Sequence, residues 1–455
     1  MNGSGTFPLQ TAGRVLRAEG WAALRERVSD RLRDSLRRRS FRAAASLSDL
    51  PPIPVLNLLS TVPTPRLGGM QLQLLTRMES EARRRPLALL YPEAESYRLE
   101  ISAAGRRLAL RPGEGPPPSP VALRDAAFER AAARAAAEVR ASALHVEGLS
   151  SIPLASLLEL RRSGLALILS VHDFSLFCPR PHLLEVPQLR FCHYSRDPER
   201  CARCLGQDWP VGLGFQEERR EIARELLHAA AAVVYPSEFL RRRHLELFPG
   251  LPESRQRVIE PASRPEVTPA PAWREGPVRH VAYVGQVQPH KGALVFEDVV
   301  QRLPPKAAPG LRWSAYGGGD PELLRRLRRL PRLSVNGYYR SGSLVGRLRR
   351  DRVDLALLLS VWPESYNLAL SECRMAGVPV VAFDHGAIGD RVRRDGGGLL
   401  VDPALGAEGI AGLLREMIDG RQAPPREPAP GAAPPPSADG AAGAFEGLYR
   451  ELGLR

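Results

Sequence analysis

The chain has 455 residues, of which 44% are hydrophobic, and a formal net charge of +14. This length is too great for a single compact core, and the apolar content is ordinary for a globular protein, so we expect two domains with extensions. No apolar run approaches the roughly 18 residues of a membrane span, and the N-terminus lacks a secretory hydrophobic region, so we expect a cytoplasmic protein.

The positive charge suits nucleic acid, anionic lipid or phosphate-rich ligands. Lys291 and Lys306 are the two lysines, and arginine supplies the rest. We attribute this skew to genomic base composition, which makes each lysine more informative than any arginine. The sequence has no interleaved aromatic and basic stripe and no recognition-helix signature, so no specific nucleic-acid partner is expected.

Residues 13–45 predict a basic amphipathic helix. Trp21, Leu24, Val28, Leu32 and Leu36 follow one another at steps of three and four, with acidic residues mixed into the polar face. Two interpretations are open. The helix packs on the main body of the protein, or it lies on an anionic membrane surface.

Residues 55–59 predict a first strand, which a loop ending in Gly68 and Gly69 connects to a helix and a second strand at 87–91. Strand, glycine turn, helix and strand form the βαβ unit of a doubly wound sheet. The two glycines would let a phosphate approach the backbone at the start of the helix.

The same α/β rhythm continues to the end of the chain. A Pro-rich connection at about 261–277 separates two series of strands, and a Pro/Ala-rich linker at 421–438 precedes a last short helix at 441–454. Further buried strands of the first series are predicted at 143–146, 165–171 and 231–235.

The stretch "PESYNLALSECRMAGVPVVAF" (363–383) places two carboxylates in apolar sequence. Ser365 is a suitable cap for a helix over 366–376, which Gly377 would end before a strand at 378–383. Glu372 would project from an apolar face of this helix, and Glu364 would lie beside its positive end. One interpretation is a core helix whose carboxylate pairs with an arginine. The other is a nucleotide site, with phosphate at the helix end and ribose on Glu372.

Upstream residues favour the nucleotide site. In "YVGQVQPHKG", Gly285 ends a strand and Lys291 precedes the next helix; "ALLLSVWPESYNLALSECRMAGVPVVAF" and "DHGAIGD" follow. Together these motifs resemble glycosyltransferase family 4, whose members are retaining, nucleotide-sugar-dependent enzymes. The resemblance covers about 53–454 and is strongest over 281–403. It implies an α/β protein with two facing Rossmann-like domains (the GT-B fold) and an active site in the interdomain cleft.

The resemblance assigns roles by position. Lys291 would hold the donor diphosphate, Glu364 would lie beside the transferred sugar, and Glu372 would bind the ribose. His172, in "SVHDF", would approach the sugar; a hydrogen-bonded structural histidine is the alternative. The remaining donor-binding candidates are Gly68, Gly69, Gly285, Gln286, Ser365, Tyr366, Asn367 and Leu368.

Two positions depart from the family pattern. Gln286 replaces the usual arginine, so it can donate a hydrogen bond but brings no charge to the diphosphate. Asn367 stands where glycine is common, which alters how closely the sugar can approach. Neither departure removes a group that we regard as essential.

The expected chemistry follows from the resemblance. The sugar would be transferred with retention through an ion-pair-like state, in which the leaving phosphate takes the acceptor's proton. A double displacement with Glu364 as nucleophile is the alternative. Lys291, the helix N-terminus and the glycine loop would stabilise the leaving group, and no catalytic cation or cofactor is predicted.

Four of the five cysteines lie within 27 positions. In a reduced cytoplasm this density favours a structural zinc ion over disulfides, with free buried thiols or a redox pair as alternatives. The candidate ligands are Cys178, Cys192, Cys201 and Cys204. Because this segment follows His172 directly, we expect it to border the acceptor side of the cleft.

The sequence therefore predicts a glycosyltransferase of hexosyl type that serves surface polysaccharide or glycolipid synthesis. Its partners would be a UDP-, GDP- or dTDP-sugar, a glycan or lipid-linked acceptor, and the inner face of the cell membrane. A nucleotide-sugar epimerase and a non-catalytic binding protein are the alternatives. The expected segments are a basic extension (1–48), an acceptor domain (49–265) with the cysteine-rich insert (178–204), a donor domain (266–420), and a linker with the last helix (421–455).

Overall fold

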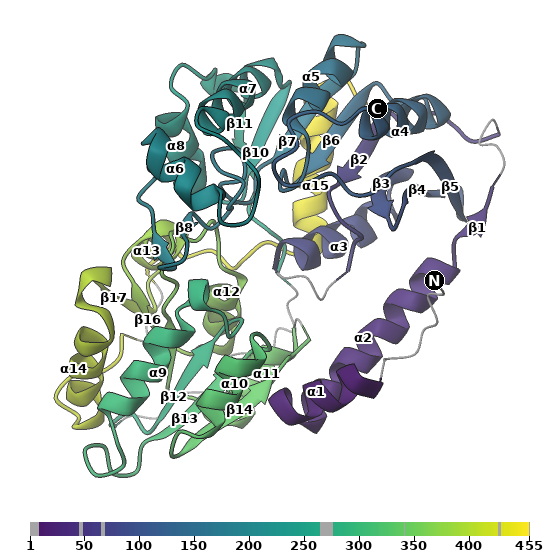
Figure 1. Ribbon diagram of the computed structural model, residues 1–455. Coiled ribbons are helices and arrows are strands. Elements are labelled where there is room, and N and C mark those ends of the chain that lie inside the picture. Colours follow the sequence, from purple (N-terminus) through teal and green to yellow (C-terminus); the bar gives the residue numbers. More distant parts are fainter. Residues whose placement is uncertain are drawn as a thin grey trace. The chain divides into compact units, whose positions relative to one another are not determined.

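The computed structural model describes residues 9–44, 49–64, 69–263, 276–340, 342–425 and 429–454. The chain divides into two compact units, each built on one large sheet (Figure 1). The six-stranded unit comprises Met1–Ser35 and Ser263–Pro435, and the nine-stranded unit comprises Leu36–Ala262 and Pro436–Arg455. The first helices of the chain thus belong with its second half, and the last helix belongs with its first half.

The six-stranded unit contains a fully parallel sheet in the order β14-β13-β12-β15-β16-β17. Numbered along the chain, this is the order 3-2-1-4-5-6 of the doubly wound dinucleotide fold. Its strands are β12 (His280–Val284), β13 (Arg312–Tyr316), β14 (Leu333–Gly337), β15 (Leu355–Leu358), β16 (Val380–Phe383) and β17 (Gly398–Val401). Its helices include α9 (Ala293–Arg302), α10 (Pro321–Arg328), α11 (Ser343–Arg350), α12 (Leu368–Ala376), α13 (Gly386–Asp395) and α14 (Gly406–Ile418).

The nine-stranded unit has the order β1-β5-β4-β3-β2-β6-β7-β10-β11, and its strands are parallel except around β4. The strands are β1 (Arg42–Ala43), β2 (Val55–Leu59), β3 (Leu87–Glu93), β4 (Ser96–Ala103), β5 (Arg106–Glu114), β6 (Ala143–Glu147), β7 (Ala166–Ser170), β10 (Ala232–Tyr235) and β11 (Gln256–Val258). Its helices include α3 (Gly69–Glu81), α4 (Ala126–Val139), α5 (Leu154–Arg162), α6 (Pro198–Leu205), α7 (Phe215–Ala229), α8 (Glu238–Leu247) and α15 (Ala438–Glu451).

The predicted strands of both halves are present, and the doubly wound α/β class is confirmed. The antiparallel strands β4 and β5 extend the first sheet beyond what the sequence analysis predicted. Among the predicted strands, β2, β6 and β12 are buried at every position, as parallel strands covered by helices should be, whereas β14 is buried only at Gly337.

The predicted N-terminal helix is two helices, α1 (Leu9–Glu19) and α2 (Trp21–Arg39). Gly20 separates them with φ +89°, a left-handed conformation that favours glycine. After Arg39 the chain leaves the helix for strand β1. The prediction of a single helix over 13–45 is therefore wrong, because Gly20 interrupts the helix and because it ends at Arg39. Ala23 is fully buried, so one side of this segment packs on the protein.

The C-terminal helix α15 packs on the sheet of the nine-stranded unit. Phe445, Leu448 and Tyr449 form one buried cluster with residues of β2, β7 and β10. No helix in the described ranges is long and apolar enough to cross a membrane.

Candidate functional site

The carboxyl ends of β12 and β15 lie side by side in the six-stranded unit, where the strand order reverses. Open α/β sheets bind ligands at this point. Gly285 and Lys291 follow β12, and Glu364 follows β15. At Gly292 (φ +80°), a Cβ atom would lie only 1.8 Å from the carbonyl oxygen of Leu359, so only glycine fits there. The absence of a side chain at Gly292 lets the turn that carries Lys291 pack closely against the segment that carries Glu364.

Lys291 and Glu364 form an ion pair across this point. The Nζ atom of Lys291 lies 2.6 Å from Oε1 of Glu364, and the side chains are 22% and 4% exposed. The hydroxyl of Ser360 donates to the same carboxylate oxygen. Nζ also lies 5.5 Å from the centre of the Trp362 ring. A buried carboxylate therefore meets a partly open ammonium, which can still reach a ligand.

Gln286 lies in the same loop and is exposed. The hydroxyl of Tyr283 lies 2.7 Å from the carbonyl oxygen of Gln286 and 3.1 Å from the carbonyl oxygen of Lys291. Both ends of the loop are thus tied to one buried ring. The loop is thus fixed by its backbone. The amide side chain of Gln286 is left at the surface, where it can donate to a ligand.

The turn before α12 differs from the prediction. The helix begins at Leu368 and is capped by Asn367, whose side chain accepts from the Leu370 amide at 2.8 Å; the prediction that Ser365 caps a helix from 366 is wrong. The physical reason is the backbone of Asn367, which has φ +73° and so cannot continue a helix. Glycine is common at this position in the resembled family, and asparagine is among the few other residues that tolerate such a φ.

Arg391 of α13 fixes this turn, and the sequence analysis missed it. Its guanidinium donates to the carbonyl oxygens of Tyr366 and Asn367, each at 3.0 Å, and to the Ser371 hydroxyl at 2.8 Å. It also lies 3.8 Å from the centre of the Tyr366 ring. In a chain so rich in arginine, nothing in the sequence distinguishes this one. The start of α12 is therefore rigid, as an anion site built from backbone amides requires.

Glu372 is a buried carboxylate on α12. It is 8% exposed and accepts from the Gly342 amide at 3.2 Å. Burial raises its pKa to about 7, and the Gly342 hydrogen bond opposes this only in part. No arginine or lysine of the described residues forms an ion pair with Glu372, so the interpretation of a carboxylate paired with arginine is wrong. An uncompensated buried carboxylate is typical of a functional site.

His172 lies in the other unit, just past β7. Its Nδ1 atom is 3.2 Å from Nε2 of Gln73, and its Nε2 atom is 3.6 Å from Oε2 of Glu147. Glu147 ends β6 and pairs with Arg77 of α3, which is 5% exposed. Burial opposes ionisation of Glu147, but Arg77, His145 and His172 together outweigh it and hold the pKa of Glu147 well below its usual range. Gln73, Arg77, Glu147 and His172 line one small cavity of about 30 Å³.

The sequence analysis missed Glu147 and Arg77. The signal that could have found Glu147 is its place at the end of a buried strand, next to the strand that precedes His172. Gly69 begins α3, the helix that carries Gln73 and Arg77 into this cavity, whereas Gly68 lies outside the described residues.

The four clustered cysteines line another cavity of about 30 Å³, beside α6 (Pro198–Leu205). The Cys201 thiol donates to the Ser195 carbonyl at 3.6 Å, and burial raises the pKa of Cys178 to about 11. Within the described ranges, no group of three or more His, Cys, Asp or Glu side chains is arranged to hold a metal ion. The structural zinc stays a prediction, which elemental analysis of zinc-supplied protein can test.

Residues 278–419 match the family model described as "Glycosyl transferases group 1". No curated protein matches the chain. Among solved structures, sucrose-phosphate synthase from Thermosynechococcus elongatus is similar at 18% identity and a TM-score of 0.57, over 88% of this chain and 98% of that one. HepE from Anabaena, in complex with UDP and glucose, is similar at 14% identity and a TM-score of 0.53, over 88% and 99%.

The catalytic domain of starch synthase IV from Arabidopsis thaliana, bound to ADP and acarbose, gives 10% identity and a TM-score of 0.51, over 89% of this chain and all (100%) of that one. At such identities these likenesses show the fold, which is the two-domain GT-B fold of glycosyltransferases. The predicted fold class is confirmed. Together with the match of residues 278–419, it supports a glycosyltransferase.

Proposed function

We propose that the chain is a retaining glycosyltransferase of family 4 that transfers a hexosyl unit from a nucleotide sugar to a glycan or lipid-linked acceptor. The Lys291–Glu364 pair carries the proposal, because it lies at the switch point of a 3-2-1-4-5-6 sheet, within a segment that matches glycosyl transferases group 1. Neither a structural pair nor a decayed site explains why Glu372 is also buried with no cationic partner among the described residues.

In this proposal Lys291 exchanges partners when the donor binds. The diphosphate competes with Glu364 for Nζ of Lys291, and Glu364 is then available to accept from a hydroxyl of the sugar. The amides at the start of α12 and the side-chain amide of Gln286 add hydrogen bonds to the phosphate. Glu372 accepts from the ribose hydroxyls.

The reaction breaks the bond between the anomeric carbon and the leaving phosphate oxygen. A bond from the acceptor oxygen to the same carbon forms on the same face, and the leaving phosphate takes the acceptor's proton. Lys291 and the positive end of α12 stabilise the charge that develops on the nucleoside diphosphate. We assign His172 to the sugar, with Glu147 as its positioning neighbour at 3.6 Å.

We further propose that the enzyme is cytoplasmic and serves surface polysaccharide or glycolipid synthesis. HepE, one of the structures with this fold, was solved with UDP and glucose, which makes a UDP-sugar the first donor to test.

A donor screen tests the proposal. Purified protein is mixed with UDP-, GDP-, dTDP- and ADP-sugars while thermal shift and nucleotide release are followed. We expect one nucleotide class to raise the melting temperature, since a ligand at a hundred times its Kd stabilises the folded state by about 2.7 kcal/mol. Lys291→Ala serves as the control, whose melting temperature should rise less than that of wild type at the same ligand concentration. The proposal fails if no nucleotide sugar shifts the wild-type protein at millimolar concentration.

Stereochemistry then separates the alternatives. Proton NMR of the product should show the anomeric configuration of the donor, with release of the nucleoside diphosphate. An inverted product would exclude retention. An epimerised sugar formed without transfer to an acceptor would favour the epimerase.

A further inference from the structure

The outward face of α2 is apolar and basic. Trp21, Leu32 and Leu36 are 72%, 51% and 66% exposed, which is unusual for three large apolar side chains on one helix. Steps of three and four residues place them along one side of the helix. The members of this outer face, in order, are Trp21, Arg25, Val28, Leu32, Leu36 and Arg39.

The packed face of α2 is acidic. Asp30 and Asp34 are 4% and 5% exposed. Asp30 accepts from the Tyr338 hydroxyl at 2.7 Å, and Glu26 accepts from the Arg340 amide at 2.7 Å. A surface helix normally buries its apolar stripe and exposes its charges. Here α2 buries Ala23 and Leu24, but the packed side also carries every acidic residue of the helix, and three large apolar side chains are left on the other side.

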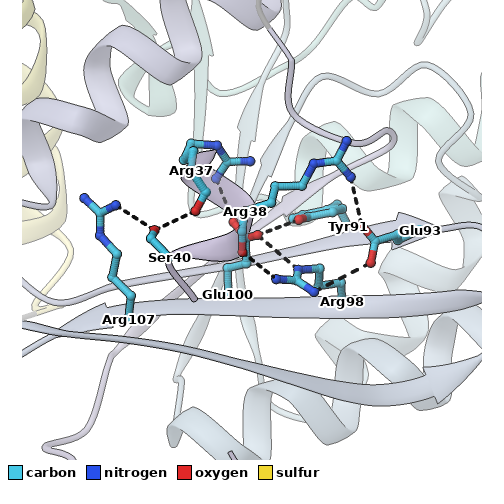
Figure 2. Close-up of polar contacts among 8 residues, drawn as sticks. All are labelled: Arg37, Arg38, Ser40, Tyr91, Glu93, Arg98, Glu100 and Arg107. Atoms are coloured by element: carbon cyan, nitrogen blue, oxygen red, sulfur yellow. Dashed lines mark hydrogen bonds and ion pairs between the residues drawn. The ribbon is translucent and has the colours of Figure 1, made fainter. Parts of the chain in front are cut away.

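Ion pairs also fix the last turn of α2. Arg37 donates to Glu100 at 2.8 Å and Arg38 donates to Glu93 at 2.9 Å, and both contacts are drawn in Figure 2. Glu100 is buried and also accepts from the Tyr91 hydroxyl at 2.7 Å. Turning the helix to bury its apolar residues would break the contacts of the packed face with Tyr338 and Arg340. The outward direction of Trp21, Leu32 and Leu36 is therefore built into the fold.

The outer face and its border carry positive charge without carboxylates. Arg25, Arg33 and Arg39 are exposed, and none of them forms an ion pair with a described residue. Just past the helix, the chain enters a polar hollow of about 690 Å³, whose lining includes Ser40, Arg42, Arg106 and Arg107. Arg107 donates to the Ser40 hydroxyl at 2.9 Å, a contact drawn in Figure 2. Apolar groups and arginine cations thus share one continuous stretch of chain.

We propose that the outer face of α2 lies on an anionic phospholipid bilayer. Tryptophan favours the boundary between headgroups and acyl chains, and leucines can enter the acyl region while arginines remain with the phosphates. A second copy of the chain is a poorer partner, because the same face of a symmetric dimer would bring arginines against arginines with no carboxylate to pair them. The inference does not depend on sugar transfer, and it concerns where the enzyme works.

Vesicle sedimentation with the full-length chain tests this proposal without any sugar donor. The protein is mixed with vesicles of phosphatidylcholine alone or with 30 mol% phosphatidylglycerol added, at low and high salt. We expect sedimentation only with the anionic vesicles, and about a hundredfold weaker binding for Arg25→Gln/Arg33→Gln/Arg39→Gln. Leu32→Glu/Leu36→Glu should abolish binding, whereas Leu213→Glu/Leu405→Glu should not, because these leucines are also exposed, at 69% and 57%, but lie elsewhere.

The outcomes decide between membrane and protein partners. Circular dichroism should show each variant folded, because all of these positions are exposed. The proposal is overturned if wild-type protein ignores anionic vesicles, or if Leu32→Glu/Leu36→Glu binds them as wild type does. It is also overturned if light scattering shows a wild-type dimer that this variant converts to a monomer without any vesicle binding.

Discussion

The ammonium of Lys291 lies 2.6 Å from the carboxylate of Glu364, and this pair joins the loops that follow β12 and β15. The two strands are neighbours in the sheet, but 73 positions of sequence separate the two residues. The parallel sheet thus brings a cation and an anion together where a ligand of such a fold is expected.

Lys291→Ala should weaken binding of the nucleoside diphosphate by about 1.5–3 kcal/mol, or roughly 10- to 150-fold in Kd, because a charge-assisted hydrogen bond is lost. Isothermal titration measures this change. Lys306→Ala is the matched control, since it removes the chain's other lysine from an exposed position. Equal dissociation constants for wild type and Lys291→Ala would remove Lys291 from the phosphate site.

Glu364→Gln and Glu372→Gln should fail in different ways. Glu364 acts beside the reacting sugar, so its variant should lower kcat with a modest change in donor affinity. Glu372 is assigned to the ribose, so its variant should raise the Kd of both the donor and the free nucleoside diphosphate. Steady-state kinetics and titration together separate the two profiles. Identical profiles would show that the division of roles is wrong.

The sequence predicts the sheet and the donor-side groups because both depend on local patterns. Apolar β-branched runs identify parallel strands, and glycine with lysine identifies the loop after β12. The contacts that hold the site in place come from distant segments. Arg391 reaches the α12 turn from the next helix, and Glu147 reaches His172 from a neighbouring strand. No local pattern indicates such partners, particularly where arginine is abundant.

The start of α12 shows the same limit on a smaller scale. Ser365 and Asn367 both have side chains that can cap a helix, so composition does not decide between them. In the structure the Asn367 side chain accepts from the Leu370 amide, while Arg391 holds the carbonyl oxygens of Tyr366 and Asn367. The positive φ of Asn367 then places the first helical residue at Leu368.

Glu372 should make the wild-type protein less stable as the pH rises from about 4.5 to about 7. Burial raises its folded pKa from 4.5 to about 7, so the folded state holds a proton that the unfolded chain has lost over this range. Each pH unit in such a range costs about 1.4 kcal/mol, or roughly 3 kcal/mol in all.

Glu372→Gln should remove this loss. We expect the variant to gain stability relative to wild type between pH 4.5 and pH 7, although it binds nucleotide less well. Urea unfolding at a series of pH values measures the difference in free energy of unfolding between variant and wild type. For Glu408→Gln, at an exposed position, this difference should not change with pH. A difference between wild type and Glu372→Gln that stays constant with pH would contradict a buried, uncompensated carboxylate.

Glu147 should have the opposite pH dependence. Burial opposes its ionisation, but Arg77, His145 and His172 together hold its folded pKa well below the usual range. The ionised carboxylate therefore stabilises the protein above about pH 4.5, and this contribution falls on acidification. Glu147→Gln should cost about 3 kcal/mol at pH 7, because the buried charge of Arg77 loses one of its two carboxylates. The difference from wild type should shrink as the pH falls below 4.5.

Activity distinguishes a positioning role from a purely structural one. If Glu147 orients His172, Glu147→Gln should lower kcat and alter its pH profile at a temperature where the variant is fully folded. Glu225→Gln is the control, since Glu225 is 55% exposed and pairs with Arg162 at 3.2 Å; it should change stability by less than about 0.5 kcal/mol. An unchanged kcat and pH profile in folded Glu147→Gln would limit Glu147 to holding Arg77, and His172 would then depend on Gln73 alone for its orientation among the described side chains.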